Sequence, residues 1–168
     1  TTIVAGGPVK FENVNGTEIG SGVKFNTTEA GSDINITTNG TAWINRIAGT
    51  VGSAGAVSVF GSTNQILEQS GKARIHAADG ISITATKENS TQNAELKSQN
   101  GPLTLTVQVR EGDEGYNTIY SSSLEVVGEG NVEISGGDAY LRSASVAARQ
   151  DDVSISGGHV FVGQSLSA

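Results

Sequence analysis

Two blocks of the sequence, residues 123–143 and 145–165, repeat one pattern of small and β-branched residues. The first contains "NVEISGGDAYL" and the second "DVSISGGHVFV", which begins 21 residues later. Three hydrophobic pairs recur at matching places: Leu124/Val126 with Val146/Ala148, Val132/Ile134 with Val153/Ile155, and Ala139/Leu141 with Val160/Val162. The two members of each pair are two positions apart, with one residue between them, which is the spacing of a strand that buries one face. Each block therefore predicts three short strands, with Gly136-Gly137 and Gly157-Gly158 at the same corner.

Hydrophobic pairs of the same kind continue this pattern backwards along the chain. Pairs that start at Ile81, Leu103, Leu124 and Val146 follow one another in steps of 22, 21 and 22 residues, and pairs at Ile34 and Val57 precede them with steps of 23 and 24. A period of this length with three short strands is typical of one coil of a β-solenoid. We therefore expect an all-β chain that folds as a right-handed parallel β-helix, with about 21–22 residues per coil and about seven coils.

The alternative all-β fold is a sandwich or jelly roll of antiparallel hairpins, which would have longer strands and no fixed register between blocks. No stretch shows the spacing and caps of an amphipathic helix. The 168 residues are long enough for one domain. Within it we expect coils over residues 26–168, while residues 1–25, which repeat least well, are expected to form an N-terminal cap or an exchanged strand.

The net charge of −7 comes entirely from residues 111–152, which hold nine acidic residues against Arg142 and Arg149. Residues 1–110 are balanced, with eight acidic and eight basic residues. No basic patch is present to neutralise phosphates, so nucleic acid is not an expected partner. No apolar run reaches the length of a membrane span, so membrane insertion is not expected either.

The sequence contains no cysteine, which excludes disulfides, thiolate metal sites and cysteine nucleophiles. It also contains no methionine, and a chain without either residue resists oxidation, which favours an extracellular or cell-surface location. The only histidines are His76 and His159, and both are expected on the surface, with Asp138 as the one plausible partner of His159. No nucleotide or hydrolase motif occurs, so we expect no enzyme and no cofactor. A polysaccharide-acting enzyme is the least favoured alternative, because such an enzyme needs long loops around a groove.

The segment "REGDEGYN", residues 110–117, gathers the side chains of Glu111, Asp113 and Glu114 between glycines. Oxygen-rich loops with glycine can bind Ca²⁺, although the spacing fits no established calcium loop. An acidic turn is the main interpretation, and a calcium site is the alternative.

Both ends of a solenoid carry unpaired strand edges that can associate with another chain. We also expect the rings of Tyr140 and Phe161 to stack on neighbouring coils, either outward as an aromatic strip or inward as part of the core. The candidate interface residues are Ile3, Val4, Val9, Phe11, Tyr140, Val160, Phe161 and Val162.

Five Asn-x-Ser/Thr sequons are candidate glycosylation sites in an exported protein. They start at Asn15, Asn26, Asn35, Asn39 and Asn89.

The repeats "GNVEISGGDAYLRS" and "DDVSISGGHVFVGQS" resemble the coils of filamentous-haemagglutinin-like adhesins and other exported bacterial β-helix proteins. "ADGISITAT" and "NGPLTLTVQ" also look like the β-helical stalks of phage-tail and secretion-system spikes. The resemblance implies non-enzymatic structural or adhesive work, with the chain itself as a partner in a filament or other oligomer and a host surface or matrix as a further one. A phage tail-spike or fibre segment that acts as a stiff oligomeric stalk is the alternative.

Overall fold

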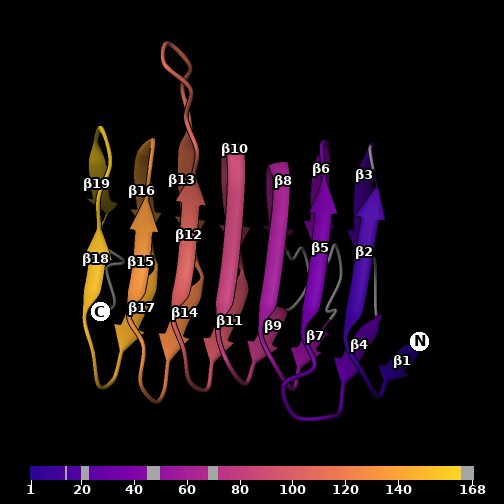
Figure 1. The fold of residues 1–168 in the computed structure, drawn as a ribbon. Helices are drawn as coiled ribbons and strands as arrows, with labels where there is room; N and C mark the ends of the chain where they lie inside the picture. The colour runs from indigo at the N-terminus through magenta and orange to yellow at the C-terminus, as the bar shows by residue number, and fades with distance from the viewer. Residues whose placement is uncertain (14, 20–22, 45–49, 68–71, 164–168) are drawn as a thin grey trace.

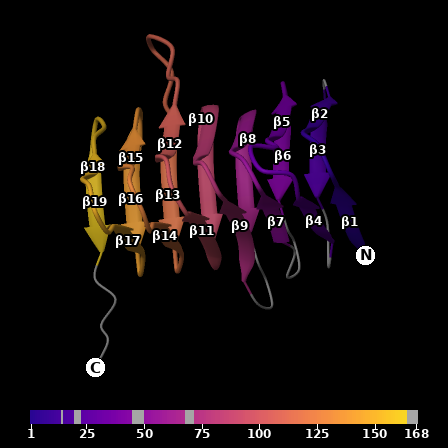
Figure 2. The ribbon, with the colours of Figure 1, turned by 60° about the horizontal axis from the view of Figure 1, so that its bottom comes forward.

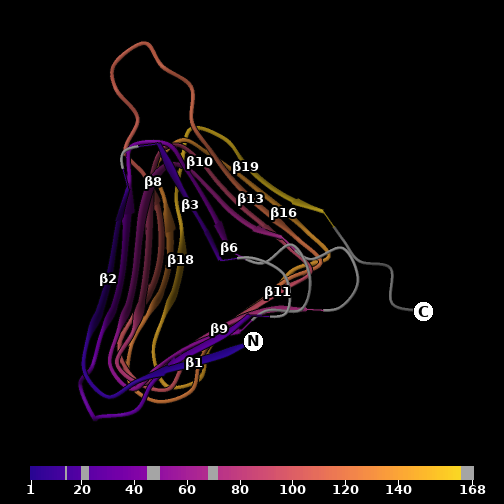
Figure 3. The ribbon, with the colours of Figure 1, turned by 90° about the vertical axis from the view of Figure 1, so that its right-hand side faces the viewer.

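The chain winds into a rod of parallel β-strands (Figure 1). The computed structural model describes residues 1–13, 15–19, 23–44, 50–67 and 72–163, and no helix occurs in these ranges. Viewed from the N-terminal end, the chain turns clockwise as it recedes, so the solenoid is right-handed (Figure 3). The predicted all-β solenoid is confirmed.

The strands form three faces with a roughly triangular outline (Figure 3). Face 1 consists of β1 (Thr2–Ala5), β4 (Lys24–Thr27), β7 (Thr50–Ser53), β9 (Ala73–Ala77), β11 (Ala94–Ser98), β14 (Ser123–Val126) and β17 (Ser145–Ala148). Face 2 consists of β2 (Val9–Asn13), β5 (Ile34–Thr38), the first halves of β8 (Val57–Leu67) and β10 (Ile81–Gln92), β12 (Leu103–Val107), β15 (Val132–Ser135) and β18 (Val153–Ile155). Face 3 consists of β3 (Gly16–Ile19), β6 (Thr41–Ile44), the second halves of β8 and β10, β13 (Tyr116–Tyr120), β16 (Asp138–Arg142) and β19 (Val160–Gly163).

Each face holds one strand from each of seven coils in the described part of the chain, and Figure 2 shows these coils side by side along the rod. Coil 1 contains β1–β3 and coil 7 contains β17–β19. At a strand spacing of about 4.8 Å, the six steps between them span about 29 Å. The first and the last described coils therefore lie at opposite ends of the rod (Figure 1).

The register of the last two coils is the one that the sequence repeat predicts. Leu124 pairs with Val146, Val132 with Val153, and Ala139 with Val160. The earlier series contains one error, because Leu103 pairs with Val132 on face 2 and not with Leu124, which lies on face 1 beside Leu96.

The source of that error is an excursion between β12 and β13, residues 108–115, which projects from the corner between faces 2 and 3 (Figure 3). It lengthens coil 5, so the step from Leu103 to its partner Val132 is 29 residues. The spacing of hydrophobic residues matched Leu103 to Leu124, which starts the next hydrophobic pair in the sequence, because that spacing does not indicate the face to which a strand belongs.

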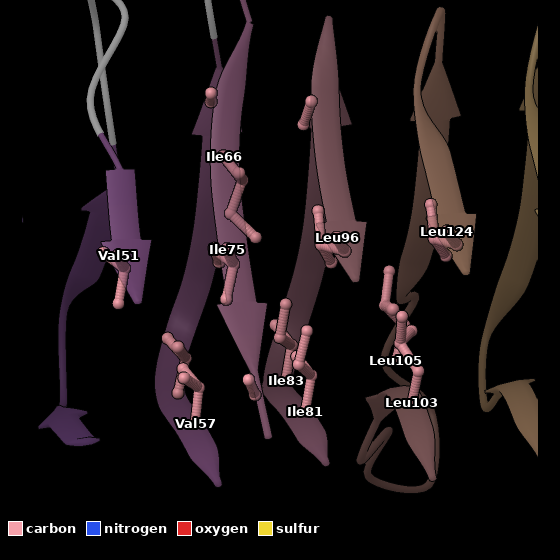
Figure 4. Packing of buried hydrophobic residues seen from close by; sticks show 14 of the residues in the cluster. Val51, Val57, Ile66, Ile75, Ile81, Ile83, Leu96, Leu103, Leu105 and Leu124 are labelled. Atoms are coloured by element: carbon pink, nitrogen blue, oxygen red, sulfur yellow. The ribbon is translucent and has the colours of Figure 1, made fainter. Parts of the chain in front are cut away.

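The core consists of ladders in which equivalent residues of successive coils stack inside the rod. On face 1 the ladder runs through Val51, Ile75, Leu96 and Leu124, all 0% exposed (Figure 4). On face 2 a parallel ladder runs through Ile34, Val57, Ile81, Leu103 and Val132. Burial of an aliphatic side chain stabilises a fold by about 1.5–3 kcal/mol, so these continuous ladders are the main source of stability.

Residues 1–25 contain strands that belong to the solenoid. β1 pairs with β4, β2 with β5 and β3 with β6, all parallel and within the same chain. In this structure the segment predicted as a cap or an exchanged strand therefore supplies coil 1, whose outer edge is the N-terminal end of the rod.

No described segment forms a helix long and apolar enough to cross a membrane.

Candidate interaction surfaces

The C-terminal end of the rod exposes side chains whose equivalents in coil 6 belong to the core. Val153, Val160 and Val162 occupy inward positions in coil 7, yet they are 43%, 46% and 67% exposed. Their equivalents in coil 6 are almost completely buried. The difference arises because no strand within the described ranges lies over β17–β19.

The N-terminal end is uncovered in the same way, but some of its apolar side chains are better packed. Ile3 and Val4 are exposed, whereas Val9 and Phe11 are half-buried against the core. The ring of Phe11 packs edge-to-face on Phe25, with ring centroids 5.3 Å apart. All eight residues predicted as interface candidates lie in the described chain, and seven of them belong to coils 1 and 7; the eighth, Tyr140, is in coil 6.

The two ends carry matching side chains at equivalent positions of the coil. If coil 7 is continued by another coil 1 in the same parallel register, Val146 faces Ile3 and Val153 faces Val9. Ile155 then faces Phe11, and Val162 faces Ile19. The one mixed inward pair is Val160 with Thr17.

Tyr140 and Phe161 point outward from face 3. Ala139 and Leu141 on either side of Tyr140 are buried, whereas Tyr140 is 39% and Phe161 57% exposed. The two aromatic residues are paired in register on β16 and β19. Of the two interpretations left open by the sequence, the structure therefore supports the aromatic strip and not the core position.

Tyr116 adds a third ring to this strip, at a centroid distance of 6.2 Å from the Tyr140 ring. Its hydroxyl donates a hydrogen bond to the Glu114 carboxylate. That bond raises the pKa of Tyr116 to about 12, because it is lost when the phenol ionises beside a negative charge. The pKa of Tyr140 is also raised, by burial and by the nearby Asp138.

The acidic segment does not assemble a metal site in this structure. Glu111, Asp113 and Glu114 are all exposed in the excursion. No three acidic or histidine side chains in the described ranges converge as metal ligands. The calcium alternative thus gains no geometric support.

The two histidines lie on different faces, each beside a carboxylate from a neighbouring coil. His76 Nε2 is 2.6 Å from Glu95 Oε1 on face 1. His159 Nδ1 is 3.3 Å from Asp138 Oδ1 near face 3, so the structure brings together the pair that the sequence repeat suggested. Both pairs join one coil to the next at the surface.

Three asparagines that sequence reasoning did not recognise as a group form a ladder inside the rod. Asn64, Asn89 and Asn117 are 0% exposed. Asn64 Nδ2 donates to Asn89 Oδ1 at 2.9 Å, and Asn89 Nδ2 donates to Asn117 Oδ1 at 3.0 Å. Their irregular spacing in the sequence, 25 and 28 residues, conceals the ladder.

This ladder removes Asn89 from the candidate glycan acceptors of the folded chain, because its amide is buried and fully engaged. Asn15 and Asn39 are exposed in turns between strands. Asn26 and Asn35 are half-buried on β4 and β5. The burial of Asn89 follows from its inward position in β10, which a sequon pattern does not reveal.

Comparison of the chain with protein-family models, with curated proteins and with solved structures gave no match.

Proposed function

We propose that this β-solenoid is a non-enzymatic structural and adhesive module that acts outside the cell and assembles end to end into a fibre or surface layer. The observation that carries the proposal is the match between the two uncovered ends. Inward apolar residues lie at equivalent positions on coil 1 and coil 7, so the ladders of one rod continue into the next.

The strand edges favour the same arrangement. The backbone donors and acceptors on the outer edges of β1–β3 and β17–β19 are free of β-ladder partners among the described strands, and free edges are templates for further pairing. A contact between two different surfaces of the same molecule is heterologous, and when it involves little rotation it propagates as an open filament. Continued coiling along the rod axis meets that condition.

Two further observations support a non-enzymatic structural role, and the composition supports a location outside the cell. Both histidines are engaged with surface carboxylates, and the fully described corners between strands are at most six residues long apart from residues 108–115. The absence of cysteine and methionine suits an oxidising environment. The chain itself is the expected partner, and a host surface or matrix is the expected adhesive target.

The test is to place a charge on one end of the rod. Ile3→Glu puts a carboxylate opposite Val146 across the proposed joint, where an unpaired charge would be desolvated. Thr104→Glu is the matched control, because Thr104 lies outward on face 2, two coils from the C-terminal end and not at the joint. We expect wild type and Thr104→Glu to form filaments by electron microscopy and concentration-dependent species in sedimentation velocity, and Ile3→Glu to remain monomeric. Filaments of unchanged length in Ile3→Glu would contradict end-to-end assembly.

A stiff stalk that oligomerises side by side is the second candidate function, as in a phage tail-spike or fibre segment. The chemistry of face 2 favours it: its outward positions are uncharged from coil 2 to coil 5. These residues are Asn35, Thr37, Ser58, Phe60, Ser82, Thr84, Thr104 and Thr106. A lateral oligomer would be a closed particle of fixed mass in light scattering, and it would survive Ile3→Glu but dissociate in Thr104→Glu.

A further inference from the structure

A shallow hollow of about 510 Å³ lies on the outer side of face 3. Its walls come from the last four coils and are aromatic on one side and polar on the other. The side chains that matter for its chemistry are Gln92, Thr118, Tyr120, Tyr140, Arg142 and Phe161.

The aromatic wall is formed by Tyr140 and Phe161. They are neighbours in register on β16 and β19, and both point away from the core. The two residues lie on adjacent strands about 4.8 Å apart, and both side chains line the hollow, so they form its apolar wall.

Arg142 supplies the positive charge. Its guanidinium lies over the Tyr120 ring, 5.9 Å from the centroid, which restrains the side chain by a cation–π contact. None of the ion pairs found among the described residues involves Arg142, whereas Arg74 and Arg149 both face carboxylates. No acidic residue lines the hollow, and the Asp138 carboxylate lies outside it, beside the Tyr140 hydroxyl. A restrained cation without a carboxylate partner is suited to a carboxylate on a ligand.

We propose that this hollow binds a uronic-acid residue of an acidic polysaccharide. The apolar face of the sugar ring lies on Tyr140 and Phe161, the sugar carboxylate pairs with Arg142, and the ring hydroxyls meet the amide of Gln92 and the hydroxyl of Thr118. The open shape of the hollow suits one residue within a longer chain.

An acidic peptide fits this surface less well. Peptides commonly bind to a sheet by adding a strand to a free edge, but the strands that line the hollow in coils 4–6 are paired with neighbours on both sides. The outer surface of the sheet offers side chains only, with hydroxyl and amide groups that match a polyhydroxylated ligand.

This inference rests on the adhesive part of the proposed function, since it names the class of surface to which the module would bind. It does not require assembly, because all the residues involved belong to one chain. It is therefore tested on the Ile3→Glu variant, which is expected to be monomeric. Failure of wild type to form filaments would leave the binding test unaffected.

The experiment is a calorimetric titration with oligogalacturonate, which carries one carboxylate per ring, at low ionic strength. Oligogalactose is the neutral probe, and poly-glutamate is the acidic probe without sugar rings. We expect binding of oligogalacturonate only. Equal binding of the neutral sugar would mean that Arg142 does not contribute to recognition. Equal binding of poly-glutamate would mean that the surface attracts any acidic polymer. Either result, or no binding at all, overturns the proposal.

Variants of the wall and of the cation then locate the site. Arg142→Gln should weaken binding by about tenfold or more, because a charged hydrogen bond is lost. Tyr140→Ala should weaken it by about fivefold through lost ring contact. Arg149→Gln is the matched control on face 1 and should leave the affinity unchanged. Circular dichroism confirms that each variant keeps its fold; equal affinities of Arg142→Gln and Arg149→Gln would place the binding elsewhere.

Discussion

The three stacked asparagines show how a polar side chain can be accommodated in the interior of a solenoid. Besides the amide-to-amide bonds, Asn64 Nδ2 donates to the carbonyl oxygen of Thr84, and Asn117 Nδ2 donates to the carbonyl oxygens of Ser135 and Gly136. These carbonyls lie at the corner between faces 2 and 3, where the β-ladder is interrupted. The stacked asparagine side chains therefore donate hydrogen bonds to backbone carbonyl oxygens that an apolar residue would leave unpaired.

Asn89→Ala should destabilise the fold by about 2–4 kcal/mol, because it leaves Asn117 Oδ1 and the Thr106 carbonyl without their buried donor. Asn35→Ala is the control, since Asn35 points outward on face 2, and it should change stability by about 0.5 kcal/mol or less. Urea unfolding followed by circular dichroism measures both. Equal effects would mean that the ladder contributes nothing specific.

Glu95 gives the fold an acid-sensitive contact between coils. Its partial burial raises its pKa, but the hydrogen bond and charge of His76, together with Arg74, outweigh this and hold the pKa below its ordinary value of 4.5. A carboxyl whose pKa is lower in the folded than in the unfolded chain stabilises the fold above the unfolded value, and this contribution is lost as the pH falls through the folded value.

We therefore expect wild type to exceed Glu95→Gln in stability near neutral pH by at most about 1 kcal/mol, as is usual for surface pairs. The difference should disappear as the pH falls below 4.5, the ordinary pKa. Thermal unfolding at a series of pH values tests this. Glu133→Gln, at an exposed site on face 2, is the control and should show no such trend. A constant difference at all pH values would rule out the linkage.

Two corners with the same sequence have different conformations in successive coils. Gly136 and Gly137 have φ values of 75° and 62°, whereas Gly157 and Gly158 lie outside the left-handed region. A Cβ on Gly136 would lie 1.9 Å from the carbonyl oxygen of Val107, at the base of the excursion. The corner of coil 6 thus needs glycine because it fits beneath the backbone of coil 5.

Gly136→Ala should therefore destabilise the fold by about 3 kcal/mol, from the left-handed conformation and the backbone clash together. Gly158→Ala should cost about 1 kcal/mol or less, since an added Cβ would meet a side-chain carboxylate, Asp138 Oδ1 at 2.8 Å, and not the backbone. The measurement is the midpoint of urea unfolding. A larger loss in Gly158→Ala than in Gly136→Ala would contradict this account of the corner.

These elements indicate how much of the fold the sequence could predict. The repeat predicted the strands and register of coils 6 and 7 because corner length and hydrophobic alternation hardly change between them. It could not predict that Leu103 pairs with Val132 and not with Leu124, because an excursion alters the sequence spacing without altering the stacking of coils. The outward direction of Tyr140 followed from alternation once Ala139 was placed inward. The burial of Asn89 could not be predicted in this way, because it depends on the corner between faces 2 and 3, where the alternation is interrupted.

At the scale of the whole molecule, the three faces differ in chemistry. Face 1 carries ion pairs that connect neighbouring coils, among them Lys97 with Glu125 at 3.6 Å and Arg149 Nε with Glu125 at 2.6 Å. Face 2 is largely uncharged, and the C-terminal half of face 3 is aromatic. Assembly along the axis would leave all three faces accessible, and it would repeat the aromatic hollow once per subunit. Weak binding to a polymer at each hollow would then add up by multivalency.

Head-to-tail assembly makes a directional prediction that other modes of association do not. Val146→Lys places a cation at the C-terminal end, and Ile3→Glu places a carboxylate at the N-terminal end, where the two positions face each other across the proposed joint. Each variant alone should remain monomeric, because its joint would contain an unpaired charge. An equimolar mixture should regain filaments in which the two variants alternate, since one joint gains an ion pair and the other is unaltered. Electron microscopy and light scattering measure the outcome, with a mixture of Ile3→Glu and Val146→Glu, whose joint would hold two carboxylates, as the control that should form no filaments. If the charge-matched mixture stayed monomeric while both variants were folded, the two ends would not meet in the register proposed here.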